Sequence, residues 1–247
     1  MWLAGLFGLC IGSFLNVLID RLPKGQSVVY GRSHCDHCKK TLRWYELIPI
    51  VSFVIQLARC RRCHKKLSLQ YPAIELLTGV GFALLFFYFA DSITKLSAYV
   101  LIFCSLIVIF FADLKYQIIP DSMVVVGIIG VGLLGSVFDV RHAQVFWISA
   151  FGASVFFLLL WLLTGGRGMG LGDVKLVFLL GLLLGYPGIV VALYAAFLTG
   201  AGVGVILMKA RHKTWKSRVA FGPFLILGTV ITILWKTQIL AWWGNIL

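Results

Sequence analysis

Long apolar runs recur along the whole chain and constrain its fold more than any other feature. A helix needs roughly 20 mostly apolar residues to cross the hydrocarbon core of a bilayer. We count eight such runs, which cover residues 2–19, 73–90, 97–112, 123–138, 145–164, 174–186, 188–208 and 220–240. Hydrophobic residues make up 60% of the chain, which exceeds the share usual for soluble domains. The runs predict an all-α integral membrane protein, a polytopic bundle of about eight transmembrane helices, and exclude an ordinary soluble enzyme.

The basic residues indicate how such a bundle is oriented. The chain has 22 Lys and Arg against nine Asp and Glu, and eleven of these cations lie in residues 20–70. With eight spans, 19 cations fall on one side of the membrane and three, Lys95, Arg141 and Lys236, on the other. Positively charged loops stay in the cytoplasm. We therefore expect the basic loops in the cytoplasm and both termini outside, with the first run, which lacks a basic leader, retained as an anchor.

Four of the six cysteines form two CxxC pairs within the basic segment. The pairs are Cys35 with Cys38 and Cys60 with Cys63, separated by 21 residues. Each CxxC forms a tight knuckle, and two knuckles can offer four thiolates to one tetrahedral ion. Cytosolic thiols stay reduced, which favours a metal over disulfides. We predict a structural zinc site; a redox pair or inert cysteines are the alternatives.

These features divide the chain into three predicted parts. Residues 1–23 form a first transmembrane anchor, residues 24–70 a small cytoplasmic zinc-binding domain, and residues 71–247 the remaining membrane core.

Two aspartates stand out because ionisable groups in or beside a membrane span are costly and commonly functional. Asp113 follows an apolar run, and Asp173 opens the sixth run after a turn that contains Gly170 and Gly172. Both lie at the predicted cytoplasmic rim. Two neighbouring carboxyl groups can share a proton and activate water against a peptide carbonyl. The alternative is that Asp173 is a helix N-cap, the interpretation that we favour for Asp121.

Five sequence segments together resemble the bacterial type IV prepilin peptidases, membrane aspartyl proteases with a GxGD motif. They are GSFLNVLIDRLP (12–23), the double CxxC loop with WYELIPIVS (44–52) between its pairs, YPAIELLTG (71–79), the segment from Asp113 to Pro120-Asp121, and GLGDVK (170–175). The resemblance covers nearly the whole chain. It implies that Asp113 and Asp173 are the catalytic pair, and that Asp121 belongs to the motif without being the catalytic acid.

The resemblance also implies the reaction and its partners. The family removes the basic leader of type IV prepilins or pseudopilins at a Gly-Phe type bond, at the cytoplasmic face of the bacterial inner membrane. Many members then N-methylate the new terminus with S-adenosylmethionine, an activity associated with the amino-terminal segment. Membrane lipids are the other expected partners, and we expect no nucleic-acid partner. Four residues are further candidates for substrate binding or methyl transfer: Glu75, Gly170, Gly172 and Lys175.

Three residues depart from the family pattern. Gln70 stands where Arg commonly precedes Tyr-Pro, and Asp36 and Lys39 replace the common Pro and Gly around the first CxxC. None affects the two aspartates. Glu75 has an alternative role as an acid that complements the dipole of the first helical turn after Pro72.

Three functional alternatives remain at this point. The first is a peptidase that lacks methyl transfer, and the second is a proton-coupled transporter. A transporter would place its acids near the midplane of the membrane instead of at one rim. The third is a thiol oxidoreductase that uses the CxxC pairs, which would need them on the oxidising side of the membrane.

Overall fold

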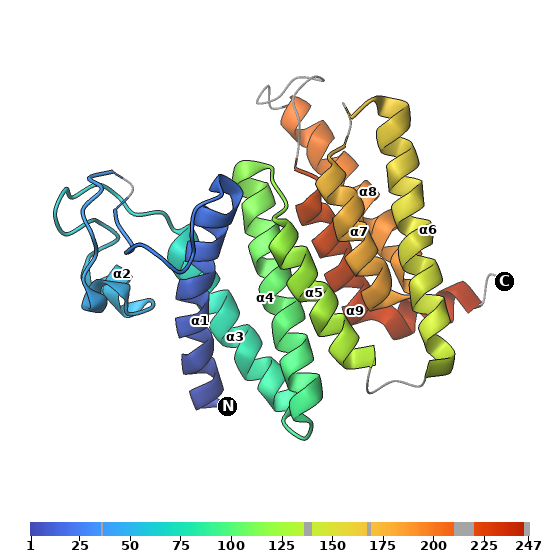
Figure 1. Cartoon of the computed structure of the whole chain (residues 1–247), viewed down its shortest axis with the longest axis horizontal. Helices are drawn as coiled ribbons and strands as arrows, with labels where there is room; N and C mark the ends of the chain where they lie inside the picture. Colours follow the sequence, from blue (N-terminus) through green and yellow to red (C-terminus); the bar gives the residue numbers. More distant parts are fainter. Residues whose placement is uncertain (36, 136–139, 167–168, 210–219, 245–247) are drawn as a thin grey trace. The chain divides into compact units, whose positions relative to one another are not determined.

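The computed structural model describes residues 1–35, 37–135, 140–166, 169–209 and 220–244, and its regular structure there is helical (Figure 1). Within these residues no β-strand forms, and only two isolated β-bridges occur. The α-helices are α1 (Trp2–Arg21), α2 (Val51–Ile55), α3 (Gln70–Phe89), α4 (Ile93–Tyr116), α5 (Asp121–Gly135), α6 (Val140–Thr164), α7 (Leu171–Leu184), α8 (Gly188–Lys209) and α9 (Gly222–Gly244). Two short 3-10 helices, η1 (Leu22–Lys24) and η2 (Trp44–Leu47), lie between α1 and α2.

The chain forms two compact units, Met1–Val108 and Ile109–Leu247. In the first unit, α1 packs along α3 through small residues one turn apart on α1. A Cβ at Gly8 would lie 2.9 Å from the Cα of Gly79, and a Cβ at Gly12 would lie 2.7 Å from the Cα of Glu75. Only glycine permits this approach, which is the small-xxx-small packing common between membrane helices.

Residues 25–69, between η1 and α3, form a compact segment that we call the cysteine module. Arg21, the last residue of α1, organises its first loop, because its guanidinium donates hydrogen bonds to four backbone carbonyls. These belong to Ser27, Tyr30, Gly31 and Arg32 and lie 3.0–3.3 Å away. Arg21 therefore joins the helix to the module.

In the second unit, α7 is the central helix. It contacts α5, α6, α8 and α9, and its Leu176, Val177, Leu179 and Leu180 are completely buried. A helix that is apolar on every side packs inside a bundle in this way. At its closest approach to α6, a Cβ at Gly181 would lie 2.5 Å from the Cα of Ala150. Gly228 of α9 makes a similarly close contact with the backbone of Ala192 of α8.

The helices confirm the all-α membrane fold, since each of the eight apolar runs corresponds to one of them. Among the described residues, five helices are long and apolar enough to cross a membrane: α1, α3, α4, α6 and α8. The 14 residues of α7 and the 15 of α5 rise only roughly 21–23 Å. The count of eight spans therefore stays a prediction.

The predicted orientation also stays a prediction. It depends in part on Arg141, Arg167, Lys236 and the basic residues of 209–218, whose positions or side chains lie outside the described part of the chain.

Candidate active site and metal centre

The four cysteines of the module meet at one point. Their sulfur atoms all lie within 4.8 Å of one another, and Cys35 Sγ is 3.9 Å from Cys63 Sγ. A tetrahedral ion with metal–sulfur bonds of about 2.3 Å would place its sulfurs roughly 3.8 Å apart. The predicted cluster therefore forms, and its spacing fits a metal of this size. The nearby His34, His37 and His64 are exposed.

The two CxxC segments adopt the same local structure. Cys35 N–H donates to Lys40 O, as Cys60 N–H does to Lys65 O, and each segment is closed by an isolated β-bridge. The fourth residue after each first cysteine has a positive φ, 57° at Lys39 and 56° at His64. Glycine adopts this conformation at little cost, whereas other residues are strained. The family's common glycine at position 39 thus has a physical reason.

Two of the thiols differ in acidity because of their surroundings. Burial raises the pKa of Cys35 to about 11. Backbone hydrogen bonds from Cys63 and Arg62 lower the pKa of Cys60 to about 7. A cation at the centre would favour the thiolate form of both, because a metal ion dominates the local charge.

Glu75 lies in a polar strip between α1 and α3. Its carboxylate is buried and accepts a hydrogen bond of 2.8 Å from the backbone N–H of Ile50, and another from Ser13. Ile50 has a φ of 59°, an unusual value for a β-branched residue. Because α3 begins at Gln70, Glu75 is in the second turn. The interpretation of Glu75 as a first-turn acid is therefore wrong.

Asn16 extends this strip by one helical turn. Its amide nitrogen donates to Gly12 O and Tyr71 O, each at 3.2 Å, and the Tyr71 hydroxyl reaches Asp20. The Oδ1 atom of Asn16 is buried and has no hydrogen-bond partner among the described residues. The strip thus offers a carboxylate and a free acceptor oxygen.

Asp113 lies in the last turn of α4 and is buried, with 5% of its surface exposed. Its Oδ2 accepts a hydrogen bond of 2.9 Å from the backbone N–H of Gly222, the first residue of α9. After α4, Gln117 has a φ of 55°, and its N–H donates to Asp113 O. This left-handed residue is a typical helix C-cap, which turns the following segment back.

Asp173 lies in the first turn of α7 and is 7% exposed. Its Oδ2 accepts a hydrogen bond of 3.1 Å from Gly170 N–H, and its own N–H donates to Gly170 O. The N-cap of α7 is Gly170, so Asp173 is not the N-cap residue. Its side chain supports the helix start from the third position and still faces the interior.

Ile119 brings the two aspartates into one site. Its Cδ1 would lie 3.4 Å from a Cβ at Gly172 and 3.4 Å from a Cβ at Gly222. Gly172 precedes Asp173, and Gly222 binds Asp113. The same methyl group of Ile119 therefore packs against the two glycines that adjoin the aspartates. The two carboxyl groups are close enough for their charges to interact. Gly172 therefore admits Ile119, and Gly170 orients Asp173.

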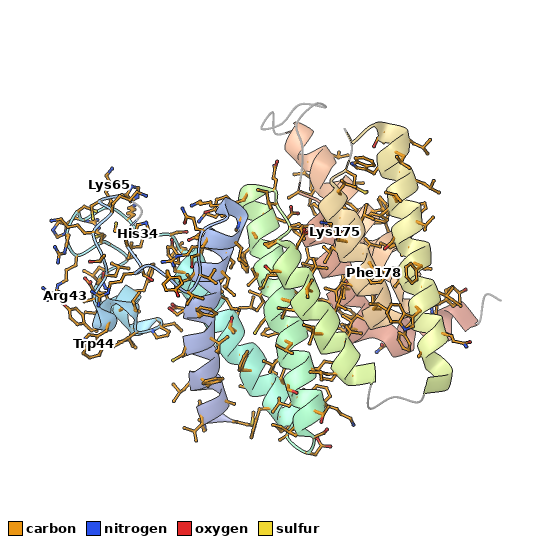
Figure 2. The ribbon with its side chains drawn as sticks, viewed as in Figure 1. His34, Arg43, Trp44, Lys65, Lys175 and Phe178 are labelled. Carbon is orange, nitrogen blue, oxygen red and sulfur yellow. The ribbon has the colours of Figure 1, made fainter. Side chains whose placement is uncertain are left out.

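Lys175 binds neither of these aspartates. Its Nζ lies 2.8 Å from both carboxylate oxygens of Asp121, and both side chains are largely exposed. Figure 2 shows Lys175 on α7, one turn before Phe178. Asp121 is the first residue of α5, and the first helical hydrogen bond runs from Val124 N–H to Pro120 O. Pro120 therefore occupies the N-cap position, and the cap interpretation of Asp121 is wrong. The pair joins the first turn of α5 to the second turn of α7.

Comparison with known proteins shows which family the chain belongs to. Two family models match in tandem, the bacterial peptidase A24 N-terminal domain over residues 6–89 and the type IV leader peptidase family over residues 100–205. A prepilin leader peptidase/N-methyltransferase of Legionella pneumophila is 32% identical over 97% of this chain and 92% of its own length. This chain belongs to the type IV leader peptidase family. A relative of the same name from Aeromonas hydrophila is also 32% identical, over 96% of this chain and 91% of its own length. A relative of the same name from Myxococcus xanthus is 37% identical over 82% of this chain and 62% of its own length. No solved structure matches the chain.

Each family model covers one candidate site. The N-terminal model contains Glu75 and the cysteines, and the leader peptidase model contains Asp113 and Asp173. Membership in a peptidase family does not favour a proton-coupled transporter. The six cysteines are free thiols, and four of them form the cluster.

Sequence reasoning missed Ile119 and Gly222. Neither carries a reactive group, and Gly222 lies beyond the residues that the family models match. The only signal at Gly222 was a Gly-Pro pair at the start of an apolar run, a common helix beginning.

Proposed function

We propose that the chain is a prepilin leader peptidase in which Asp113 and Asp173 are the catalytic pair. The observation that carries this proposal is the burial of two carboxyl groups, from α4 and α7, while Gly172 beside Asp173 and Gly222 bound to Asp113 both pack against Ile119. Neither group forms an ion pair with a residue that the structure describes. Buried carboxyl groups are costly and are typically kept for function.

The hydrogen bonds suggest how the pair works. Gly222 N–H and Gly170 N–H each hold one Oδ2 atom in place. Among the described residues each Oδ1 accepts no hydrogen bond, which leaves it for water or substrate. One carboxylate removes a proton from a water molecule while the other, protonated, donates to the scissile carbonyl or the leaving amine. No covalent acyl-enzyme forms, and the two groups titrate as a pair.

The substrate in this proposal is a type IV prepilin or pseudopilin. Its apolar helix lies among the spans in lipid, so the Gly-Phe type bond reaches the site at the cytoplasmic surface of the inner membrane. The bias of basic residues toward one side supports this orientation.

The test is cleavage of a prepilin by protein reconstituted in lipid vesicles. Asp113→Asn and Asp173→Asn each preserve shape but remove the carboxylate, and we expect cleavage to fall by about 10³-fold or more. The matched control is Asp91→Asn, since Asp91 is exposed in the loop between α3 and α4. Near-normal cleavage by either active-site variant, correctly inserted, would refute the assignment.

We further propose that the first unit transfers a methyl group to the new amino terminus. Its relatives carry the name N-methyltransferase. S-adenosylmethionine would supply an electrophilic methyl group on a cationic sulfonium. The buried Glu75 carboxylate and the free Asn16 Oδ1 fit a cationic group, and Glu75 could accept the proton that the amine loses.

Two substitutions separate a chemical role of Glu75 from a structural one. Glu75→Gln keeps an oxygen for the Ile50 N–H but removes the charge, whereas Glu75→Ala removes both. We expect mature pilin from the Glu75→Gln enzyme to be cut but to lack the 14 Da of a methyl group in mass spectrometry. Full methylation by this variant would leave Glu75 with only a structural role.

We also propose that the four cysteines hold a structural zinc ion. All four coordination positions are filled by protein, so the metal would stabilise the module without taking part in the reaction. Metal analysis should find one zinc per chain, and Cys35→Ser or Cys60→Ser should lower it. Purified protein with four free thiols and no metal would contradict the proposal.

A further inference from the structure

The cysteine module exposes large apolar side chains around η2 and α2, which contact each other. Trp44, Val54, Ile55 and Leu57, which we call the apolar face, are 62–81% exposed. They belong to η2, α2 and the turn that follows. Four such side chains on a module of this size are more than the scattered apolar residues of an ordinary surface.

The backbone is strained where it presents this face. Leu57 and Ala58 have φ values of 49° and 58°, consecutive left-handed conformations that favour glycine. Hydrogen bonds hold the turn, from Ala58 N–H to Phe53 O and from Leu67 N–H to Ala58 O. Strain of this kind persists only when the surroundings determine it. The fold therefore holds Leu57 outward.

The module is also strongly basic. Residues 20–70 contain eleven Lys and Arg but only three acids. One of these acids, Glu46, accepts a hydrogen bond from the backbone N–H of Arg43. In the described part of the chain, no acidic side chain forms an ion pair with Arg59, Arg61 or Arg62, and all three are exposed. These arginines are available to an external anion.

Apolar and cationic side chains meet in one pocket of about 780 Å³. Ile48, Val51, Ile55 and Leu57 form its apolar wall, and Arg59 and Arg61, on either side of Cys60 in the sequence, form its cationic part. The guanidinium of Arg61 lies 5.7 Å from the centre of the Tyr45 ring. A ligand that satisfies both parts carries an anionic group next to a hydrocarbon chain.

We propose that the apolar face docks on the membrane surface and that the pocket binds an anionic phospholipid from it. The phosphate would lie between Arg59 and Arg61, and the first part of the acyl chain against Val51 and Ile55. Charge complementarity selects this occupant, because basic residues beside apolar ones favour anionic interfaces. The abundance of aromatic residues at membrane interfaces agrees with the exposed Trp44.

Figure 2 shows how two labelled side chains of the module lie relative to each other. Trp44 and Lys65 lie at opposite edges of the module, and Arg43 lies near Trp44. The edge with Trp44 would face the lipid, and the edge with Lys65 would face water.

The test is hydrogen–deuterium exchange on the whole protein in nanodiscs. Peptides covering residues 51–58 should exchange at least fivefold more slowly in discs with one third phosphatidylglycerol than in pure phosphatidylcholine. Arg59→Gln/Arg61→Gln should abolish the difference, since each cation near an anionic surface contributes about a fivefold preference. Lys39→Gln/Lys40→Gln removes the same charge from the other CxxC segment, whose exposed lysines do not line the pocket, and should keep most of the difference in exchange.

Two further measurements keep the proposal falsifiable. Native mass spectrometry should show fewer retained anionic lipids on the arginine variant, and its zinc content should equal that of the lysine variant if both fold. Equal exchange in both lipids overturns the proposal. Protection that free glycerol phosphate reproduces also overturns it, because the ligand is then a soluble anion. Protection that appears only with added prepilin indicates the substrate, and protection that depends on protein concentration indicates a second copy; either result overturns the proposal.

Discussion

Gly222 provides a sharp test of the active-site geometry, because it has no reactive group and acts only through its backbone. Its N–H holds Asp113 Oδ2 at 2.9 Å. In Gly222→Ala the new Cβ would lie 2.7 Å from the same oxygen and 3.3 Å from Cγ. Ordinary contacts begin at 3.4 Å, so the carboxylate must move by about 0.7 Å.

The size of the effect follows from this displacement. A misplacement of about 1 Å at a reacting group costs about 10²-fold in rate. A hydrogen bond to a charged group contributes about 1.5–3 kcal/mol, and its loss gives a similar factor. Since the two effects describe one event, we expect kcat/KM for prepilin cleavage to fall by about 10²-fold, with most of the loss in kcat.

The assay is initial-rate cleavage in lipid vesicles, with Gly132→Ala as the matched control. A Cβ at Gly132, on α5, would meet nothing within 4 Å. That variant should cleave at the wild-type rate, and thermal unfolding should show that both variants fold. Wild-type kcat/KM for Gly222→Ala would show that the position of Asp113 does not depend on this contact.

Three further predictions concern the module and the helix packing. Lys39→Gly relieves the left-handed backbone and should strengthen zinc retention by about 1 kcal/mol, measured as slower loss of metal to a chelator; faster loss would contradict it. Asp121→Lys and Lys175→Asp should each lower stability by about 1 kcal/mol or less, because the pair is exposed, and the exchanged double variant should recover it in thermal unfolding. Gly181→Leu should prevent stable folding, since even a Cβ there lies 2.5 Å from Ala150, and a normal melting temperature would show that α6 and α7 can separate.

The cysteine cluster could be predicted from sequence because its determinants are local. A CxxC segment folds its two sulfurs to one side by its own turn, and the same hydrogen bonds recur at Cys35 and Cys60. Four thiols on two knuckles have few other arrangements that satisfy them. The left-handed conformation at Lys39 was hidden, because a non-glycine residue gives no sign of it.

The apolar runs predicted the helices but not their ends. The run that ends at residue 112 continues as helix to Tyr116, so that Asp113 lies inside α4. Likewise α3 begins at Gln70, before the apolar run, and Glu75 therefore lies in its second turn and not in its first. Polar residues at a membrane surface extend a helix without extending its apolar pattern, so hydropathy marks the lipid boundary and not the helix boundary.

The contacts that complete the active site could not be predicted, because they join distant residues without chemical signals. Asp113 and Gly222 are 109 residues apart, and Lys175 and Asp121 are 54 apart. Ile119 is one apolar residue among many, and only its packing beside Gly172 and Gly222 gives it a role. Which glycine meets which side chain is determined by how α4, α7 and α9 pack.

The two proposed reactions depend on separate contacts, yet their order is fixed by chemistry. Glu75 is held by Ile50 and Ser13 within the first unit, and Asp113 is held by Gly222 within the second. A substitution at either site should therefore leave the other site intact. The amine that receives the methyl group, however, exists only after the peptide bond is cut. Asp113→Asn should then yield prepilin that is neither cut nor methylated, whereas Glu75→Gln should yield cut, unmethylated pilin. Supplying the Asp113→Asn enzyme with mature, unmethylated pilin should restore methylation, because only the first unit is needed for that step.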